Sequence, residues 1–179
     1  MSFDLQVLEQ GTLPASPGIN FHASIMRSRP DVNCTIHTHA RSISALATTG
    51  RSFDVYYVYG CMFADLVTSF VDDHTLTPDA EGEAIATALG NNKVVLMPHH
   101  GSVHCSDTLE HTVAETIAFA IACEYQLDSI RFGGQPIDAR SARSYKDAYY
   151  KFGFREQMWL ANYRRLRISD PDLFFSLLS

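Results

Sequence analysis

An almost uninterrupted apolar run is the feature that most restricts how this chain can fold. Residues 93–97 read Lys-Val-Val-Leu-Met and lead directly into His99-His100-Gly101. Apolar residues that follow one another without alternation are typical of a strand covered on both faces, so the run predicts a sheet between two layers. Residues 33–38 (NCTIHT) and 54–59 (DVYYVY) contain many β-branched and aromatic residues and are predicted as two further strands.

Helix signals alternate with these strands. Ser16 and Pro17 predict the N-cap and first turn of a helix over residues 17–28, and Thr77-Pro78-Asp79 predicts the start of another over 78–89. Further helices are expected at residues 40–48 and between residues 142 and 166.

The longest helix is expected to follow Asp107, which forms a capping-box pattern with Glu110. Apolar residues then recur every four positions, and we expect this stripe to face the core. Its members are Leu109, Val113, Ile117, Ile121 and Tyr125.

Length and charge exclude several classes of protein. The 179 residues fit one domain, residues 1–179, and a net charge of −6 offers no general attraction for a nucleic-acid backbone. No apolar stretch has the roughly 18 residues of a membrane helix, and the start Met1-Ser2-Phe3-Asp4 has no signal-peptide pattern. The four cysteines are scattered and are interpreted as reduced thiols. A cytoplasmic protein without nucleic-acid or membrane partners is expected.

Histidines form the main candidate site. In a strand, His37 and His39 project to the same side, roughly 6–7 Å apart, which suits two ligands of one ion. A third ligand is available from His99-His100-Gly101, where the glycine permits a sharp turn. The alternative is that these are strand-end histidines hydrogen-bonded to carbonyl groups.

Other histidines are interpreted structurally. His22 lies on an apolar helix stripe and is expected in the core, His111 is expected to be solvated, and His74 is expected in an exposed loop or in a lid over the site. His104 and Cys105 are adjacent in the sequence and point to opposite faces of a strand, which excludes simple chelation by this pair.

The segments LPASPGINFHASIMRSRPDVNCTIHTHA (13–40) and KVVLMPHHG (93–101), followed by a long helix, resemble the class II aldolase/adducin family. The resemblance implies an α/β fold, a three-layer α/β/α sandwich with a central, mostly antiparallel sheet. It also implies a tetramer with active sites between subunits. Carried over by position, the metal ligands fall on His37, His39 and His100, and His99 takes a structural role.

Further site residues follow from the same resemblance. A proton-donating tyrosine from a neighbouring subunit falls on Tyr57, with Tyr56 and Tyr59 as alternatives, and Ser16 remains as a substrate-binding residue. Two departures from the family are evident. Gly18 stands where the aldolases carry their catalytic Glu, and the chain is expected to lack the family's N-terminal segment, which helps to hold phosphate.

The resulting hypothesis is a metal-dependent carbon–carbon lyase. It would act on a small hydroxy- or keto-acid or a sugar derivative, and Gly18 favours decarboxylation over aldol cleavage because loss of CO₂ needs no base. Zinc is the first choice of cofactor, with manganese or iron as alternatives, and a homotetramer is expected. Two other hypotheses stay open: a non-catalytic assembly or binding domain like the adducin head, and a different reaction on the same metal.

Overall fold

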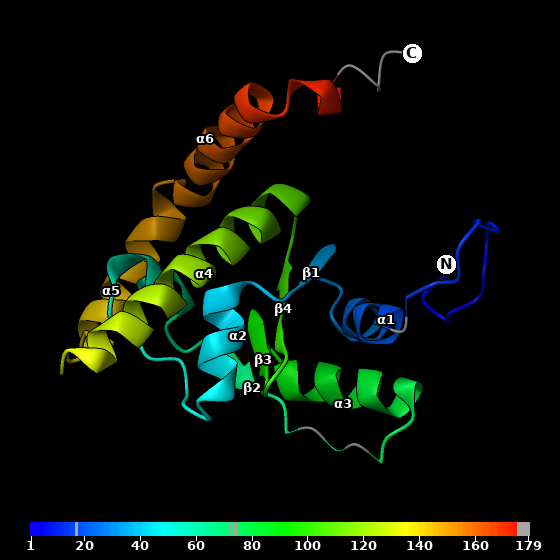
Figure 1. Ribbon diagram of the computed structural model, residues 1–179, viewed down its shortest axis with the longest axis horizontal. Coiled ribbons are helices and arrows are strands. Elements are labelled where there is room, and N and C mark those ends of the chain that lie inside the picture. Colours follow the sequence, from blue (N-terminus) through cyan, green and yellow to red (C-terminus); the bar gives the residue numbers. More distant parts are fainter. Residues whose placement is uncertain (17, 72, 74, 175–179) are drawn as a thin grey trace.

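A four-stranded sheet forms the centre of the computed structural model, which describes residues 1–16, 18–71, 73 and 75–174 (Figure 1). The strands are β1 (Cys34–Thr38), β2 (Val67–Ser69), β3 (Val94–Met97) and β4 (Gly101–Ser106). Their order is β1-β4-β3-β2, and only the β2–β3 pair is parallel. The prediction of a mostly antiparallel sheet is confirmed.

Helices cover both faces of this sheet, which confirms the predicted α/β/α sandwich (Figure 1). One layer contains α1 (Ile19–Ser28) and α3 (Pro78–Leu89), and the other contains α2 (Arg41–Thr48) and α4 (Leu109–Arg131). The remaining helical elements are η1 (Val58–Phe63), α5 (Ala139–Lys151), α6 (Phe154–Ser169) and η2 (Pro171–Phe174). Within the described ranges, no helix combines the length and apolar character needed to cross a bilayer.

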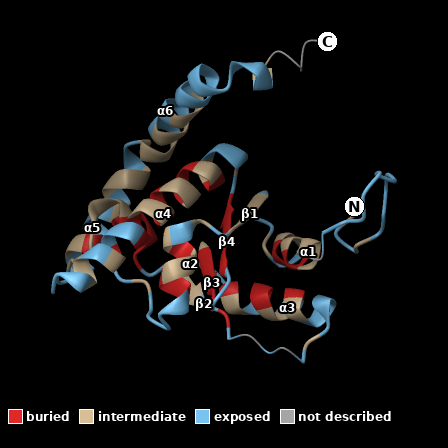
Figure 2. Cartoon of the chain, in the orientation of Figure 1, coloured by how far each residue is buried: buried red, intermediate tan, exposed pale blue. Residues whose placement is uncertain are grey.

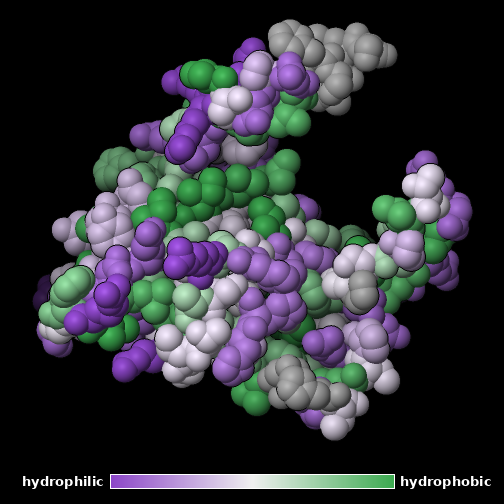
Figure 3. Space-filling model, viewed as in Figure 1, coloured by the Kyte–Doolittle hydropathy of each residue, from purple (hydrophilic) through white to green (hydrophobic). Residues whose placement is uncertain are grey.

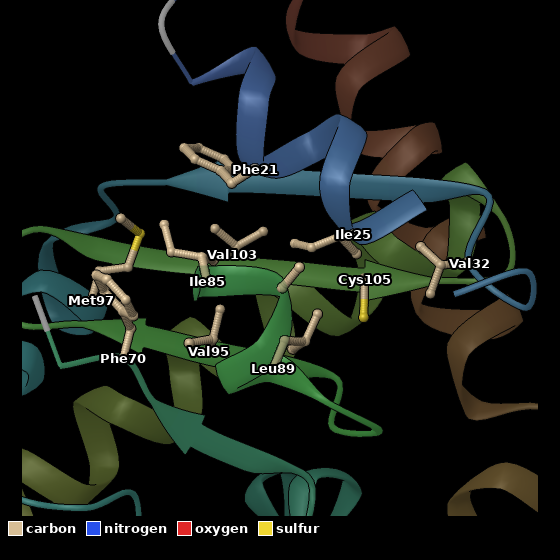
Figure 4. Close-up of a cluster of buried hydrophobic side chains, with 11 residues drawn as sticks. Phe21, Ile25, Val32, Phe70, Ile85, Leu89, Val95, Met97, Val103 and Cys105 are labelled. Atoms are coloured by element: carbon tan, nitrogen blue, oxygen red, sulfur yellow. The ribbon is translucent and has the colours of Figure 1, made fainter. Parts of the chain in front are cut away.

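The apolar run of β3 supplies both cores, as its sequence predicts. Val95 and Met97 pack toward α1 and α3, in a cluster that also holds Phe21 (Figure 4). Val94 and Leu96 pack toward α2 and α4. The buried residues in Figure 2 lie on the strands and on the helix faces turned to them. Because successive strand residues point to opposite faces, one short strand joins both layers.

Two helix starts differ from the sequence predictions. Helix α1 begins at Ile19 with Gly18 as N-cap, and Ser16 contributes its backbone carbonyl to the Ile19 N–H instead of acting as the cap. Pro17 lies outside the described residues. Helix α4 is capped by Thr108, whose hydroxyl accepts the His111 N–H at 3.1 Å, so the predicted Asp107 capping box is wrong.

The predicted strand at residues 54–59 is also wrong. The backbone there is bound by groups outside the sheet: the Gln126 side chain accepts the Asp54 N–H at 3.0 Å, and the Val55 carbonyl accepts the Ile137 N–H at 2.6 Å. From Val58 onward the chain forms η1. These partners replace strand pairing, so β-branched and aromatic residues at this position pack against α4 and α5 without joining the sheet.

The four-residue stripe of α4 does not form the core. Its end members Leu109 and Tyr125 are 55% and 45% exposed, whereas the buried face carries smaller residues such as Ala114, Ala118 and Ala122. A repeat of four drifts about 40° around the helix per step, because one turn takes 3.6 residues. Alanines allow α4 to approach the sheet closely, and Phe119, which is not part of the stripe, is the large apolar residue that α4 buries in the core.

His111 is paired, not solvated as expected. Its two ring nitrogens lie 2.8 Å from carboxylate oxygens of Asp107 and Glu156, which ties the start of α4 to the start of α6. His74 falls outside the described residues.

A buried histidine makes the free energy of unfolding depend on pH. His104 on β4 is 2% exposed, and only its Nε2 is bonded, to the Ser102 hydroxyl at 2.8 Å. Burial lowers the pKa of His104 to about 3. The unfolded chain therefore takes up this proton at higher pH, and stability should fall as pH drops from about 6.5 toward 3, by up to about 1.4 kcal/mol per pH unit.

Chemical denaturation at several pH values measures this effect. His104→Gln keeps a polar partner for Ser102 and does not titrate, so its stability should decline less steeply than that of the parent below pH ~6.5. Equal slopes for the two proteins would contradict the assignment.

Candidate metal site

The ends of two neighbouring strands bring the predicted histidines together. His37 lies in β1 opposite Val103, His39 follows the strand, and His100 lies in the turn between β3 and β4. One nitrogen from each ring forms a set whose members all lie within 4.8 Å of one another. Their ring centroids are 4.6 to 4.9 Å apart. Two segments about 60 residues apart in the sequence thus meet at one point.

Gly101 makes this meeting possible. A Cβ atom at Gly101 would collide with the Thr38 carbonyl oxygen and would lie 3.0 Å from Cδ2 of His39. The turn before it also contains His99 in a left-handed conformation, with φ of 56°, and the Ser44 hydroxyl donates to the His100 carbonyl at 2.8 Å. Gly101 is therefore required for close approach of β1 and β4, and His99 shapes the turn without belonging to the histidine cluster.

The hydrogen bonds of His37 orient its free nitrogen. Nδ1 lies 3.0 Å from the Ser102 carbonyl oxygen, which can only accept, so Nδ1 carries the proton. Nε2 then has its lone pair free and lies 2.8 Å from Nε2 of His39. A backbone carbonyl that holds the second nitrogen is the usual support of a metal-bound histidine.

The protonation state of His37 also suits a metal-binding residue. Burial, together with the nearby His100 and His39 rings, lowers the pKa of His37 despite the hydrogen bond to Ser102. Its imidazole is therefore neutral at pH 7, which is the form that binds a metal. Three imidazole nitrogen donors suit zinc, iron or copper better than magnesium or calcium, which prefer oxygen.

Helix α1 closes one side of the cluster. The Phe21 ring lies 5.2 Å from the His37 ring, and His22 is hydrogen-bonded to the Thr35 hydroxyl at 2.6 Å on the neighbouring strand. His22 is thus a hydrogen-bonded structural histidine, but it is only half-buried and does not lie in the core as expected. In the described part of the chain, the candidate ligand set contains three histidines and no carboxylate.

The other two predicted site residues, Ser16 and Tyr57, contact residues outside the histidine cluster. Ser16 is exposed just before α1, and its hydroxyl accepts the Gly18 N–H at 3.3 Å. Tyr57 lies before η1 and stacks on Tyr125 of α4, with ring centroids 3.9 Å apart, and also contacts Tyr59. A role for Tyr57 at the histidines of its own chain has no support from these contacts.

Sequence reasoning missed two supporting groups. The Ser102 carbonyl and the Phe21 ring both contact His37, but a backbone carbonyl leaves no side-chain signal. Ser102 is paired with Thr38 across β1 and β4, and no turn connects these two strands directly, so their register could not be predicted from the local sequence.

Comparison with known proteins agrees with this geometry. The family described as "Class II Aldolase and Adducin N-terminal domain" matches residues 1–127. L-fuculose phosphate aldolase of Escherichia coli K12 is 32% identical over 103 residues, which are 57% of this chain and 47% of that protein. A Streptomyces roseochromogenus protein, "4-hydroxy-3-prenylphenylpyruvate oxygenase/4-hydroxy-3-prenylbenzoate synthase", is 34% identical over 128 residues, which are 69% and 46% of the two chains.

Solved structures share the fold. L-fuculose 1-phosphate aldolase from Glaciozyma antarctica superposes with a TM-score of 0.77 at 21% identity, covering 94% of this chain and 68% of that one. The chain spans about half the length of the two curated relatives, 47% and 46%.

Proposed function

This chain belongs to the class II aldolase/adducin family, and from that membership we propose that it is a metal-dependent carbon–carbon lyase for a small hydroxy- or keto-acid or sugar derivative. The observation that carries the proposal is the convergence of His37, His39 and His100 on one point. When bound there, a divalent ion would supply Lewis acidity toward charge that develops on a substrate oxygen. Zinc is our first choice because all three donors are imidazoles, and manganese or iron are the alternatives.

The surrounding residues prepare the site for this chemistry. The Ser102 carbonyl fixes the tautomer of His37, and the Phe21 ring excludes water from one side of it. Ser16, at the start of α1, has a hydroxyl proton to offer a substrate oxygen while its own oxygen accepts the Gly18 N–H.

Within this proposal, decarboxylation is favoured over aldol cleavage. Retro-aldol cleavage needs a base that removes the hydroxyl proton, and the position of that base holds Gly18. Loss of CO₂ needs only a later protonation of the product. The Streptomyces relative adds support, because its name describes a phenylpyruvate, which is a keto-acid.

A proton donor completes the proposal. We assign this role to Tyr57 of a neighbouring copy, in a homo-oligomer expected to be a tetramer. In its own chain, Tyr57 stacks on Tyr125 at the surface of α4, so its hydroxyl would have to serve the histidines of another copy.

The second candidate function is a non-catalytic assembly or binding domain. It is favoured by Gly18 in place of the acid and by the adducins in the family description. Elemental analysis of protein purified without chelator, followed by a screen of keto-acids and sugar phosphates, separates the two. An assembly domain has no need of a tight metal site, so metal-free, inactive protein would favour it.

Placing a glutamate at position 18, where the aldolases carry one, tests whether the reaction is decarboxylation or aldol cleavage. A Cβ at Gly18 would lie 3.0 Å from Cζ of Phe21, so Gly18→Glu requires only a small movement of that ring. A decarboxylase should gain little from Gly18→Glu, whereas an aldolase that has lost its base should gain about 10²–10⁴-fold in sugar-phosphate cleavage. Steady-state rates on both substrate classes measure this difference.

Gly18→Gln is the matched control, because it has the same size and cannot act as a base. A rise in sugar-phosphate cleavage of about a hundredfold in Gly18→Glu but not in Gly18→Gln, with no CO₂ release by the parent, would overturn the decarboxylase assignment.

A further inference from the structure

Ser102 of β4 is connected to every part of the histidine cluster. It lies two residues after His100 in the sequence. Across β1 and β4 it is paired with Thr38, which stands between His37 and His39. Its carbonyl oxygen also accepts the Nδ1–H of His37 at 3.0 Å. A displacement of Ser102 would therefore move all three candidate ligands.

The side chain of Ser102 points away from these histidines, to the face of the sheet that α2 and α4 cover. Successive strand residues alternate between faces, and Val103 belongs to the core cluster under α1 and α3. On the α4 side, the Ser102 hydroxyl oxygen lies 2.8 Å from Nε2 of His104. The His104 ring packs edge to face with Phe119 of α4, with ring centroids 5.3 Å apart. A chain of contacts thus leads from α4 through the sheet to His37.

The stability of the core does not account for this buried polar pair. Hydrophilic residues gather on the surface, as Figure 3 shows for one face of the molecule, whereas Ser102 and His104 are both buried. Nδ1 of His104 has no hydrogen-bond partner among the residues that the structure describes. An unpaired buried polar group costs more free energy than one hydrogen bond typically gains, so apolar residues of similar size should be at least as stable here.

The turn before β4 is held by hydroxyl groups on both sides of Gly101. On one side, the Ser44 hydroxyl of α2 donates to the His100 carbonyl at 2.8 Å. Gly101 itself has no side chain that could anchor the turn. On the other side, the hydrogen bond between Ser102 and His104 fixes the first residue of β4 that carries a side chain. The pair therefore lies where the position of His100 is determined.

We propose that Ser102 and His104 are positioning residues of the metal site, an inference that rests on the proposed function as a metal-dependent lyase. The hydrogen bond between their side chains fixes the peptide unit of Ser102. The carbonyl of that residue then holds Nδ1 of His37 and leaves its Nε2 directed at His39. Groups that orient a ligating histidine typically change metal affinity by about 10- to 100-fold, and we expect the lower value because His104 acts through Ser102.

Competition with a zinc chelator of known affinity measures the effect on metal binding. Ser102→Ala and His104→Leu each remove the hydrogen bond, and each should weaken Zn²⁺ binding about tenfold. Because both changes remove the same interaction, the double variant should also lose only about tenfold. His104→Gln keeps a group that can bond to the Ser102 hydroxyl, so its Zn²⁺ affinity should stay within about twofold of the parent.

Ser106→Ala is the matched control for Ser102→Ala. Ser106 is also buried and lies on the same face of β4, but at the end of the strand away from the histidines, where its hydroxyl donates to Asp107 at 2.9 Å. The variant loses a buried hydroxyl of the same kind. It should therefore lose stability and keep its Zn²⁺ affinity.

The tautomer of His37 is a second readout, and it needs no metal. Imidazole ¹⁵N chemical shifts of the metal-free parent should show the proton on Nδ1 of His37, where the Ser102 carbonyl accepts it. In Ser102→Ala and His104→Leu, part of the population should carry the proton on Nε2, because the carbonyl is no longer held in place. His104→Gln and Ser106→Ala should keep the parental tautomer.

Several results would overturn the proposal. An unchanged Zn²⁺ affinity or an unchanged His37 tautomer in Ser102→Ala and His104→Leu, with circular dichroism showing folded proteins, is one. A tenfold loss of affinity in His104→Gln, or a loss in Ser106→Ala equal to that in Ser102→Ala, is another, since the effect would then not depend on this hydrogen bond. A parent that binds no Zn²⁺ would contradict the proposed function, and the tautomers alone would then decide whether the pair positions His37.

Discussion

Replacing His37 and His39 together with alanine should abolish metal retention and leave the fold intact. The two rings supply two of the three nitrogens that converge within 4.8 Å, and His39 is exposed at the strand end. Metal content should fall from about one ion per chain to background. Lewis-acid help is worth several kcal/mol, so lyase activity should fall roughly a thousandfold or more. Elemental analysis and steady-state kinetics measure the two effects.

His99→Asn is the matched control for this variant. His99 is exposed next to the cluster, and its left-handed backbone is tolerated by asparagine. Metal and activity should both persist in His99→Asn. Retention of metal at the parental level in the double alanine variant would show that these histidines are not the ligands.

Gly101→Ala should destabilise the protein strongly and disturb the site at the same time. The new methyl group would overlap the Thr38 carbonyl oxygen, and β1 has little freedom to withdraw because Thr38 is paired with Ser102. Overpacking of this kind costs about 3 kcal/mol of unfolding free energy. The separation of β1 from β4 would also move His39 away from His100. Chemical denaturation and metal content measure the two consequences.

Gly60→Ala provides the comparison. Gly60 is also buried, but an added Cβ would meet only side chains, at 3.3 Å or more. Side chains can shift where a paired backbone cannot, so the cost should stay below about 1.5 kcal/mol. Equal losses of stability at the two positions would contradict the role given to the Thr38 carbonyl.

Local signals predicted some elements well. The Thr77 cap with Pro78 marks the start of α3, and the structure confirms it, because the Thr77 hydroxyl oxygen accepts the Ala80 N–H. The apolar run of β3 is buried along its whole length. Such signals depend on a few consecutive residues, and their physical cause is local: a cap bonds within its own turn, and a run without polar residues must be covered.

Other predictions failed where distant groups supplied the partners. The segment 54–59 has the composition of a strand, yet its backbone groups are hydrogen-bonded to Gln126 and Ile137.

Glu115 shows the same limit of prediction from neighbouring residues. It is 2% exposed on α4 and bonded to Lys93, Tyr150 and Arg155, from three other segments. Nothing in the neighbouring sequence predicts a buried carboxylate held by two cations.

The sequence by itself determined the alternation of helices and strands, the covered central strand and the three histidines of the candidate site. Each of these follows from residue types at short spacing, and the family resemblance joined His100 to the other two. The tertiary structure alone decided which face of α4 is buried, how Ser102 orients His37, and why residue 101 must be glycine. These features depend on the close approach of segments more than 60 residues apart, as the contact of His37 with Ser102 shows. Packing distance between such segments is set by the whole fold, so no local pattern encodes it.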